Sequence, residues 1–162
     1  MSFNLAQFVR HRPWLYHFTH ADNVDMLRRE TAMLSAAAWV ERANGFEIGQ
    51  VPDPNTFLGA PRLASIPLRV GAGQVVRLND QLPLQHRANF YGLVGSYEDF
   101  VRCLNSLVFF WPGNERVATP KGNLAASFER HYESFGTLRI PTADVWGGSN
   151  TIRFCRYNSG AP

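Results

Sequence analysis

Apolar and polar positions along the chain follow two different periods, which predicts a mixture of helices and strands. The first helix is expected over Asn4–Arg12 and should stop at Pro13, because proline restricts the preceding residue to extended backbone. A strand is expected over Trp14–Phe18, where aromatic residues dominate. Thr19 is expected to cap the helix that follows, with Asp22 reaching back from the first turn. The strand should therefore end directly at the start of a helix.

The middle of the chain predicts one helix and then two strands. Ser35 is a good N-cap for a helix that should end at Gly45. The stretch Ile66–Val70 alternates apolar and other residues, and Pro67 within it predicts a strand at the edge of a sheet, because proline cannot donate to a neighbouring strand. A further strand should run through Leu78.

The second half begins with a strong helix signal. Ser96 is followed three residues later by Asp99, which predicts a capped N-terminus. Apolar residues then recur at helical spacing and include Cys103, which is expected to lie in the core.

The remaining apolar stretches predict strands around one more helix. Leu107–Trp111 is continuously apolar and should form a short buried strand, and a helix is expected after Pro120. Thr137–Pro141 and Thr151–Tyr157 are expected to be the closing strands. Because strands and helices do not alternate regularly, the pattern predicts the α+β class.

Composition indicates one globular domain over residues 1–162, with 45% apolar and 18% charged residues. The net charge of +3 is a mild basic excess, which suits a nucleotide or nucleic acid partner but also an ordinary solvated surface. No apolar run reaches the length of a membrane span, and the N-terminal residues lack the apolar run of a secretory signal. We therefore expect a cytoplasmic protein with no membrane partner.

Common catalytic and metal-binding motifs are absent. Cys103 and Cys155 are far apart and have no CxxC spacing, which argues against a disulfide framework or a zinc site. Gly71–Gln74 precedes a strand instead of opening a helix, so it is not a dinucleotide-binding loop. His17 and His20 have no third ligand at a supporting spacing, and no metal site is expected.

The exit of the first predicted strand is the main candidate for chemistry. Side chains alternate across a strand, so His17 and Thr19 should share one face while Tyr16 and Phe18 share the other. If the aromatic face packs on the core, the imidazole faces a cleft at the strand end. The alternative is that His17 is a core histidine with satisfied hydrogen bonds and Thr19 only a helix cap.

Three further stretches carry polar or aromatic groups that could serve a site. Asn79–Gln81 is a polar corner, although asparagine and aspartate are also ordinary turn residues. Val108–Gly113 could supply a stacking ring or simply be a buried sheet core. Arg156–Gly160 places polar groups after the last predicted strand.

The segment LYHFTHADNVDMLRRETAMLSAA, which starts at Leu15, resembles the opening of NAD-using proteins with the ADP-ribosyltransferase-like fold. Within that group the chain is most similar to an uncharacterised bacterial family with VRLxDQxPL, LNxxVFFWP and terminal NSG segments. Here these are VRLNDQLPL (Val76–Leu84), LNSLVFFWP (Leu104–Pro112) and NSG (Asn158–Gly160). The HxT opening is shared with nucleic-acid-modifying members, including bacterial toxins that ADP-ribosylate DNA bases.

This resemblance implies a split, bent β-sheet with flanking helices, whose cleft holds NAD as the co-substrate. His17 would contact NAD and take part in catalysis, with Thr19 beside it. The ring that stacks on nicotinamide would come from Tyr91, Phe110, Trp111 or Tyr132, and the diphosphate would be held by Arg69, Arg77 or Arg130. The NAD contacts that we select are His17, Thr19, Arg77, Gln81, Trp111, Tyr132, Asn158 and Ser159.

The sequence departs from the family pattern at the catalytic acid. The last strand should offer a glutamate near the cleft, but Arg156, Asn158 and Ser159 stand there instead. Asp80 could supply the carboxylate, and we select it as catalytic together with His17. Glu129 or Glu133 could reach in from a helix. In a third arrangement Asn158 and Ser159 hold the ribose and no acid is present.

Three functions follow from these alternatives. The first is an NAD-dependent ADP-ribosyltransferase, in the glycosyltransferase class, which modifies a nucleic acid base or a protein side chain. The second is a nucleotide-binding module of the same fold without catalysis. The third is a structural domain whose aromatic residues are all core. The resemblance to toxins also implies a neutralising partner protein.

Overall fold

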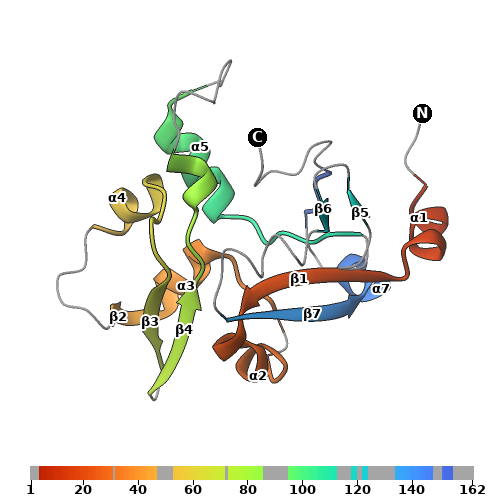
Figure 1. Cartoon of the computed structure of the whole chain (residues 1–162), viewed down its shortest axis with the longest axis horizontal. Helices are drawn as coiled ribbons and strands as arrows, with labels where there is room; N and C mark the ends of the chain where they lie inside the picture. The colour runs from red at the N-terminus through yellow and green to blue at the C-terminus, as the bar shows by residue number, and fades with distance from the viewer. Residues whose placement is uncertain are drawn as a thin grey trace. The chain divides into compact units, whose positions relative to one another are not determined.

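The computed structural model of the chain describes residues 4–30, 32–46, 53–71, 73–85, 95–112, 118–119, 122–123, 134–147 and 151–154. The chain divides into two compact units. The first unit comprises Met1–Val24 and Phe109–Phe154, and the second comprises Asp25–Val108 and Cys155–Pro162. Each unit combines helices with a small antiparallel sheet, which confirms the α+β class (Figure 1). Among the described residues, no helix is long and apolar enough to span a membrane.

The first unit begins with the expected helix and strand. Helix α1 (Leu5–His11) is capped by the Asn4 side chain and ends one residue before Arg12, which precedes Pro13. Strand β1 (Trp14–His20) follows and pairs antiparallel with β7 (Phe135–Pro141) along its whole length. The two strands lie side by side in Figure 1, in red and blue.

The expected cap after β1 is wrong by one residue. The N-cap of the short 3-10 helix η1 (Ala21–Asn23) is His20, whose Nδ1 accepts a hydrogen bond from the Asp22 amide at 3.2 Å. Thr19 is still within β1, because the strand extends two residues beyond the predicted Phe18. Helix α2 (Val24–Leu27) continues from η1.

The end of β7 is anchored to the start of β1. Helix α7 (Thr142–Trp146) begins with the fully buried Thr142, whose amide donates to the Pro13 carbonyl at 3.0 Å. The Thr142 hydroxyl donates to the Arg12 carbonyl. Strands β5 (Ala118–Thr119) and β6 (Gly122–Asn123) form a separate small ladder.

Of two further expected strands, one is not formed and the other is described only in part. Leu107–Phe110 has no ladder, and Trp111 makes only an isolated bridge with Tyr16. Thr151–Phe154 has no regular structure, and the rest of that predicted strand lies outside the described residues, as does most of the helix expected after Pro120. An apolar run alone predicted burial in a sheet, but strand formation also needs a partner along the run.

The second unit is built on a three-stranded sheet. Helix α3 (Ala36–Arg42) is capped by Ser35 as expected, and it ends at Ala43, where β2 (Ala43–Phe46) begins, and not at the predicted Gly45. Strands β3 (Ile66–Val70) and β4 (Gln74–Leu78) complete the order β2-β3-β4.

Strand β3 is therefore central, and the prediction of an edge strand is wrong. Among the described residues, the β3 partners of β2 are Val70 and Leu68, and Pro67 is not one of them. Proline has no amide hydrogen to donate, and within the described part of this ladder no β2 residue lies opposite it. Leu68, between the two neighbouring strands, is fully buried.

Helices α4 (Pro54–Gly59) and α5 (Tyr97–Asn105) lie in the same unit, with the short η2 (Leu82–Gln85) between them in the chain. Ser96 and Asp99 form the predicted capping box, and the hydrogen bonds from Ser96 hold the pKa of Asp99 below its usual value. The buried face of α5 carries Tyr97, Val101 and Asn105. Cys103 is exposed, so its predicted place in the core is wrong.

Candidate functional site

His17 is held in one tautomer by the backbone beside β1. Its Nδ1 lies 3.0 Å from the carbonyl oxygen of Phe109. A carbonyl can only accept a hydrogen bond, so Nδ1 carries the proton and donates it. In the neutral ring, Nε2 then has a lone pair and can accept a hydrogen bond from another molecule.

Burial keeps the imidazole neutral. It lowers the pKa of His17, and the hydrogen bond to Phe109, which raises the pKa, opposes this only in part. A pKa below the ordinary value of about 6.5 leaves the ring uncharged at neutral pH. His17 can therefore act as an acceptor or a base, but not as a fixed positive charge.

The face of β1 that carries His17 is more enclosed than the sequence predicts. Leu15 and Thr19, on the same face, are 4% and 6% exposed, while His17 itself is half-buried. Phe18 on the opposite face is also buried. The imidazole is thus only partly covered, between two buried neighbours.

Thr19 has a structural partner. Its Oγ1 accepts a hydrogen bond from Nδ2 of the buried Asn23 at 2.9 Å. This bond ties the end of β1 to η1. The Thr19 hydroxyl retains its own proton, which a neighbouring acceptor could still use.

The aromatic ring of Phe110 lies against the His17 ring. The two ring centroids are 5.9 Å apart and the planes are tilted by 55°. Trp111, which the sequence suggested for stacking, packs instead edge-on against Phe18, with centroids 5.1 Å apart. Two backbone hydrogen bonds between Tyr16 and Trp111, both of 2.9 Å, hold this segment against the edge of β1 that β7 does not use.

The polar corner at the end of β4 is part of a hydrogen-bond network. The Gln81 amide nitrogen Nε2 donates to Oδ1 of Asn105 at 3.1 Å, and its Oε1 accepts from the Arg62 amide at 3.3 Å. Asp80 Oδ1 accepts from the Leu82 amide at 3.2 Å and so stabilises the turn into η2. Arg77 lies on β4, opposite Pro67, and is half-buried.

A buried arginine stands at the centre of this network. Arg62 is 8% exposed and donates from Nη1 to Asn105 Oδ1 at 2.7 Å and from Nε to the Asn79 carbonyl at 2.9 Å. Asn105, 2% exposed, donates in turn to the Leu58 carbonyl at 2.8 Å. No sequence pattern singled out Arg62, and Asn105 appears only as the asparagine of the LNxxVFFWP segment. The signal for Asn105 was a polar residue on the apolar face of a well-capped helix.

The selected residues fall into separate groups. His17, Thr19 and Trp111 belong to the first unit, and Arg77, Asp80 and Gln81 belong to the second. Within each unit, the residues of the group lie on backbone segments that are next to one another. Arg69, the further arginine candidate, is exposed on β3. The remaining candidates lie outside the described residues: Tyr91, Glu129, Arg130, Tyr132, Glu133, Arg156, Asn158 and Ser159. Among the described residues, no three histidine, cysteine or acidic side chains are grouped so that they could hold a metal ion.

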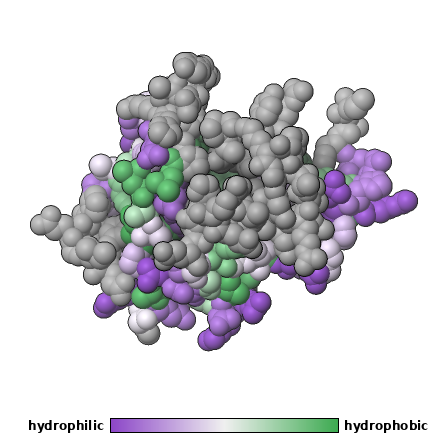
Figure 2. All heavy atoms as spheres, in the orientation of Figure 1, coloured by the Kyte–Doolittle hydropathy of each residue, from purple (hydrophilic) through white to green (hydrophobic). Residues whose placement is uncertain are grey.

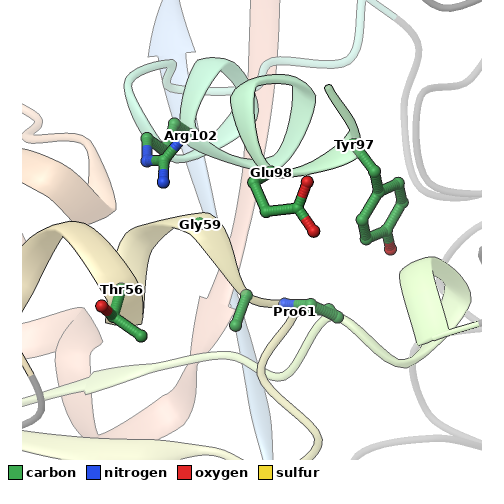
Figure 3. Close-up of a pocket in the computed structure, with 7 residues that line it drawn as sticks. Thr56, Gly59, Pro61, Tyr97, Glu98 and Arg102 are labelled. Carbon is green, nitrogen blue, oxygen red and sulfur yellow. The ribbon is translucent and has the colours of Figure 1, made fainter. Parts of the chain in front are cut away.

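A cavity of about 280 Å³ lies in the second unit between α4 and α5. Figure 3 shows that Glu98 and Arg102 project toward it from α5, opposite Thr56, Gly59 and Pro61. The Arg102 guanidinium is held by Asp99 at 2.8 Å and by the Asn55 carbonyl at 3.3 Å. None of the described residues selected for NAD lines this cavity.

A family model described as a family of unknown function (DUF7002) matches residues 13–162, and the chain belongs to this family. The match includes β1, β7 and the whole second unit. No curated protein matches the chain. No solved structure matches it either.

Proposed function

We propose that this member of the DUF7002 family binds NAD beside β1 and transfers ADP-ribose to a nucleic acid base or a protein side chain. The ADP-ribosyltransferase-like fold is part of the proposal. Its support from the sequence is the set of segments that resemble that group, in order, from Leu15 to Gly160. Its support from the structure is the fixed tautomer and the neutral charge of one side chain.

That side chain is His17. Its Nδ1–H is committed to the Phe109 carbonyl, so Nε2 of the neutral ring is an acceptor for a hydroxyl group. NAD carries ribose hydroxyls that donate such hydrogen bonds. In functional sites a histidine ring is typically held in one tautomer and one orientation by a hydrogen bond from its other nitrogen. A wrongly oriented ring could not accept a hydrogen bond from the ligand.

Phe110 supplies an aromatic ring for stacking beside the proposed contact between His17 and NAD. Its ring lies 5.9 Å from the His17 ring and is half-buried. Aromatic rings prefer offset or tilted arrangements at such distances, and a nicotinamide or adenine ring can stack in the same way. We therefore assign the stacking role to Phe110 in place of Trp111.

The transfer itself breaks the bond between the ribose C1′ and the nicotinamide nitrogen. The bonding electron pair leaves with nicotinamide, the acceptor nucleophile forms the new bond to C1′, and the acceptor proton passes to a base. The transition state resembles an oxocarbenium ion, so orientation of the ribose and a nearby negative charge provide most of the rate gain. The proposal assigns the ribose contact to His17, and Asp80 is the carboxylate that the sequence resemblance nominates.

A second candidate is a nucleotide-binding module without catalysis, and one observation favours it. Asp80 and Gln81 already bind within the second unit, Asp80 to the Leu82 amide and Gln81 to Arg62 and Asn105. Residues committed to a turn and a buried network are less available to a substrate. In this candidate the His17 contact persists and no bond is broken.

One experiment on the whole protein distinguishes the two candidates. NAD should raise the melting temperature in both, with a stabilisation of about 2.7 kcal/mol at 100 times Kd. Only the transferase should release nicotinamide, measured by chromatography after incubation with single-stranded DNA, RNA or a protein mixture. A melting temperature unchanged at millimolar NAD would contradict both.

A further inference from the structure

We propose that single-stranded nucleic acid binds to a surface of the first unit formed by Trp14, Arg139, Arg10 and Arg12, here called the Trp14 surface. The observations that support binding to this surface do not depend on the proposed function. That the bound strand is the acceptor for ADP-ribose rests on the proposed function. Three features of the first unit support the surface: a stacked pair, neighbouring segments without acidic residues, and the backbone that holds the parts together.

The stacked pair is Trp14 and Arg139. The guanidinium carbon of Arg139 lies 4.4 Å from the centroid of the Trp14 ring. The register explains this contact, because Arg139 is opposite Tyr16 and its side chain shares a face of the sheet with Trp14. Both residues are exposed, and Trp14, at 37%, is one of the most exposed large apolar side chains among the described residues.

An exposed tryptophan with a cation over its ring is a platform for bases. Every base has a π-face, and stacking on an aromatic or guanidinium plane does not depend on sequence. In a duplex these faces are covered by neighbouring base pairs, so the platform suits unpaired bases.

The positive charge comes from two elements. Arg10 and Arg12 are exposed at the end of α1, and Arg139 is exposed on β7. Neither Leu5–His20 nor Phe135–Pro141 contains an aspartate or glutamate. Within the part of the chain that the structure describes, no carboxylate pairs with any of these three arginines. Figure 2 shows hydrophilic surface over α1.

The backbone holds these parts in one place. The Thr142 amide and hydroxyl donate to the carbonyls of Pro13 and Arg12, which fixes the end of α1 against the end of β7. Arg12 is therefore hydrogen-bonded through its carbonyl to Thr142, which lies three residues after Arg139 in the chain. Arginine binds phosphate in a bidentate manner, so the three guanidiniums can follow a phosphate backbone while a base stacks at Trp14.

Fluorescence anisotropy with labelled oligonucleotides tests this inference without NAD. The probes are an oligonucleotide of about 12 nucleotides as single-stranded DNA, the same sequence as RNA, and the DNA duplex, each at about 50 and about 200 mM salt. We expect the single strands to bind more tightly than the duplex, with affinity falling as salt rises. Trp14→Leu and Arg139→Gln should each weaken binding by at least about fivefold.

Arg42→Gln is the matched control. Arg42 is also exposed and lies 5.9 Å from a tryptophan ring, but that ring belongs to Trp39, which is buried and cannot receive a base. Equal loss in Arg42→Gln, or no binding by the parent protein at the lower salt concentration, would overturn the inference. Circular dichroism melts verify folding, and if Trp14→Leu does not fold, Arg139→Gln decides the result.

Two further measurements test the partner class and the independence from the NAD site. Vesicles that contain phosphatidylserine test for an anionic membrane as the partner, and binding to vesicles but not to oligonucleotides would overturn the assignment. His17→Asn should bind the oligonucleotides as the parent does. If oligonucleotides bind at the Trp14 surface but NAD does not bind at all, the proposed function fails while the nucleic acid surface stands.

Discussion

The imidazole of His17 donates from Nδ1 to the carbonyl oxygen of Phe109, at 3.0 Å and across 92 positions of the sequence. This bond fixes the tautomer of a half-buried histidine and leaves its Nε2 as an acceptor. It also ties β1 to the segment that carries Phe110 and Trp111, and the Trp111 backbone bridges to Tyr16 of the same strand.

The stability of the protein should fall when the pH is lowered through about 6.5. The pKa of His17 is lowered in the folded state by burial, so the unfolded chain takes up this proton first. Between the two pKa values the unfolded state binds more protons, and the free energy of unfolding therefore rises with pH in that window. Above about pH 6.5 the contribution is constant.

Urea unfolding from about pH 5.5 to about pH 7.5 measures this slope. His17→Asn should reduce it, because asparagine can still donate to the Phe109 carbonyl but does not titrate. His11→Gln removes an exposed histidine of α1 and serves as the control. An unchanged slope in His17→Asn would show that His17 is not the group responsible.

Asn105 is expected to be essential for the second unit. Asn105→Leu would leave Arg62 and Gln81 without the oxygen that both now use. The loss of one hydrogen-bond partner in the interior costs about 1–3 kcal/mol, and more when the group is charged, as the Arg62 guanidinium is. The exposed Asn55→Ala should change the free energy of unfolding by less than about 0.5 kcal/mol in the same urea titration. Equal effects of the two variants would contradict the role of the network.

Gly136 is expected to tolerate no side chain. A Cβ at this position would overlap Cγ2 of Val24, with the Ala21 backbone 3.5 Å away. Gly136→Ala should therefore destabilise the protein by about 1–3 kcal/mol, as overpacked substitutions do. Val24→Ala should recover part of the loss in the double variant, which thermal melts can measure. Gly147→Ala, where the nearest atom is an ordinary 3.4 Å away, is the control.

A substitution of Asp80 distinguishes ADP-ribose transfer from NAD binding. If Asp80 is the catalytic carboxylate, Asp80→Asn should lower the rate of nicotinamide release at least about a hundredfold while NAD affinity changes little. Asparagine keeps the acceptor oxygen for the Leu82 amide, so the turn into η2 should survive. Equal rates in the parent and Asp80→Asn would remove Asp80 from the reaction.

Signals that act within a few residues were predicted well from the sequence. Asn4, Ser35 and Ser96 each cap the expected helix, because a cap depends only on the next three residues. Alternation along β1 also placed His17 and Thr19 on one face. These are properties of the local chain and need no knowledge of the fold.

Features that depend on contacts between residues far apart in the sequence were not predicted. Pro67 suggested an edge strand, but β3 lies between β2 and β4 and is therefore central. Cys103 has apolar spacing, yet α5 buries the face of Val101 and Asn105. The network of Arg62 and the bond from His17 to Phe109 join residues far apart in the chain, and no local pattern identifies such partners.

The central claim is that Nε2 of His17 accepts a hydrogen bond from NAD. Titration calorimetry of NAD into the parent and His17→Asn measures it directly, since asparagine can replace the Nδ1 donor but not the Nε2 acceptor. We predict that His17→Asn keeps a melting temperature near that of the parent and binds NAD about tenfold more weakly, which corresponds to about 1.4 kcal/mol. The same Kd in both proteins, or no binding of NAD by the parent, would contradict the claim.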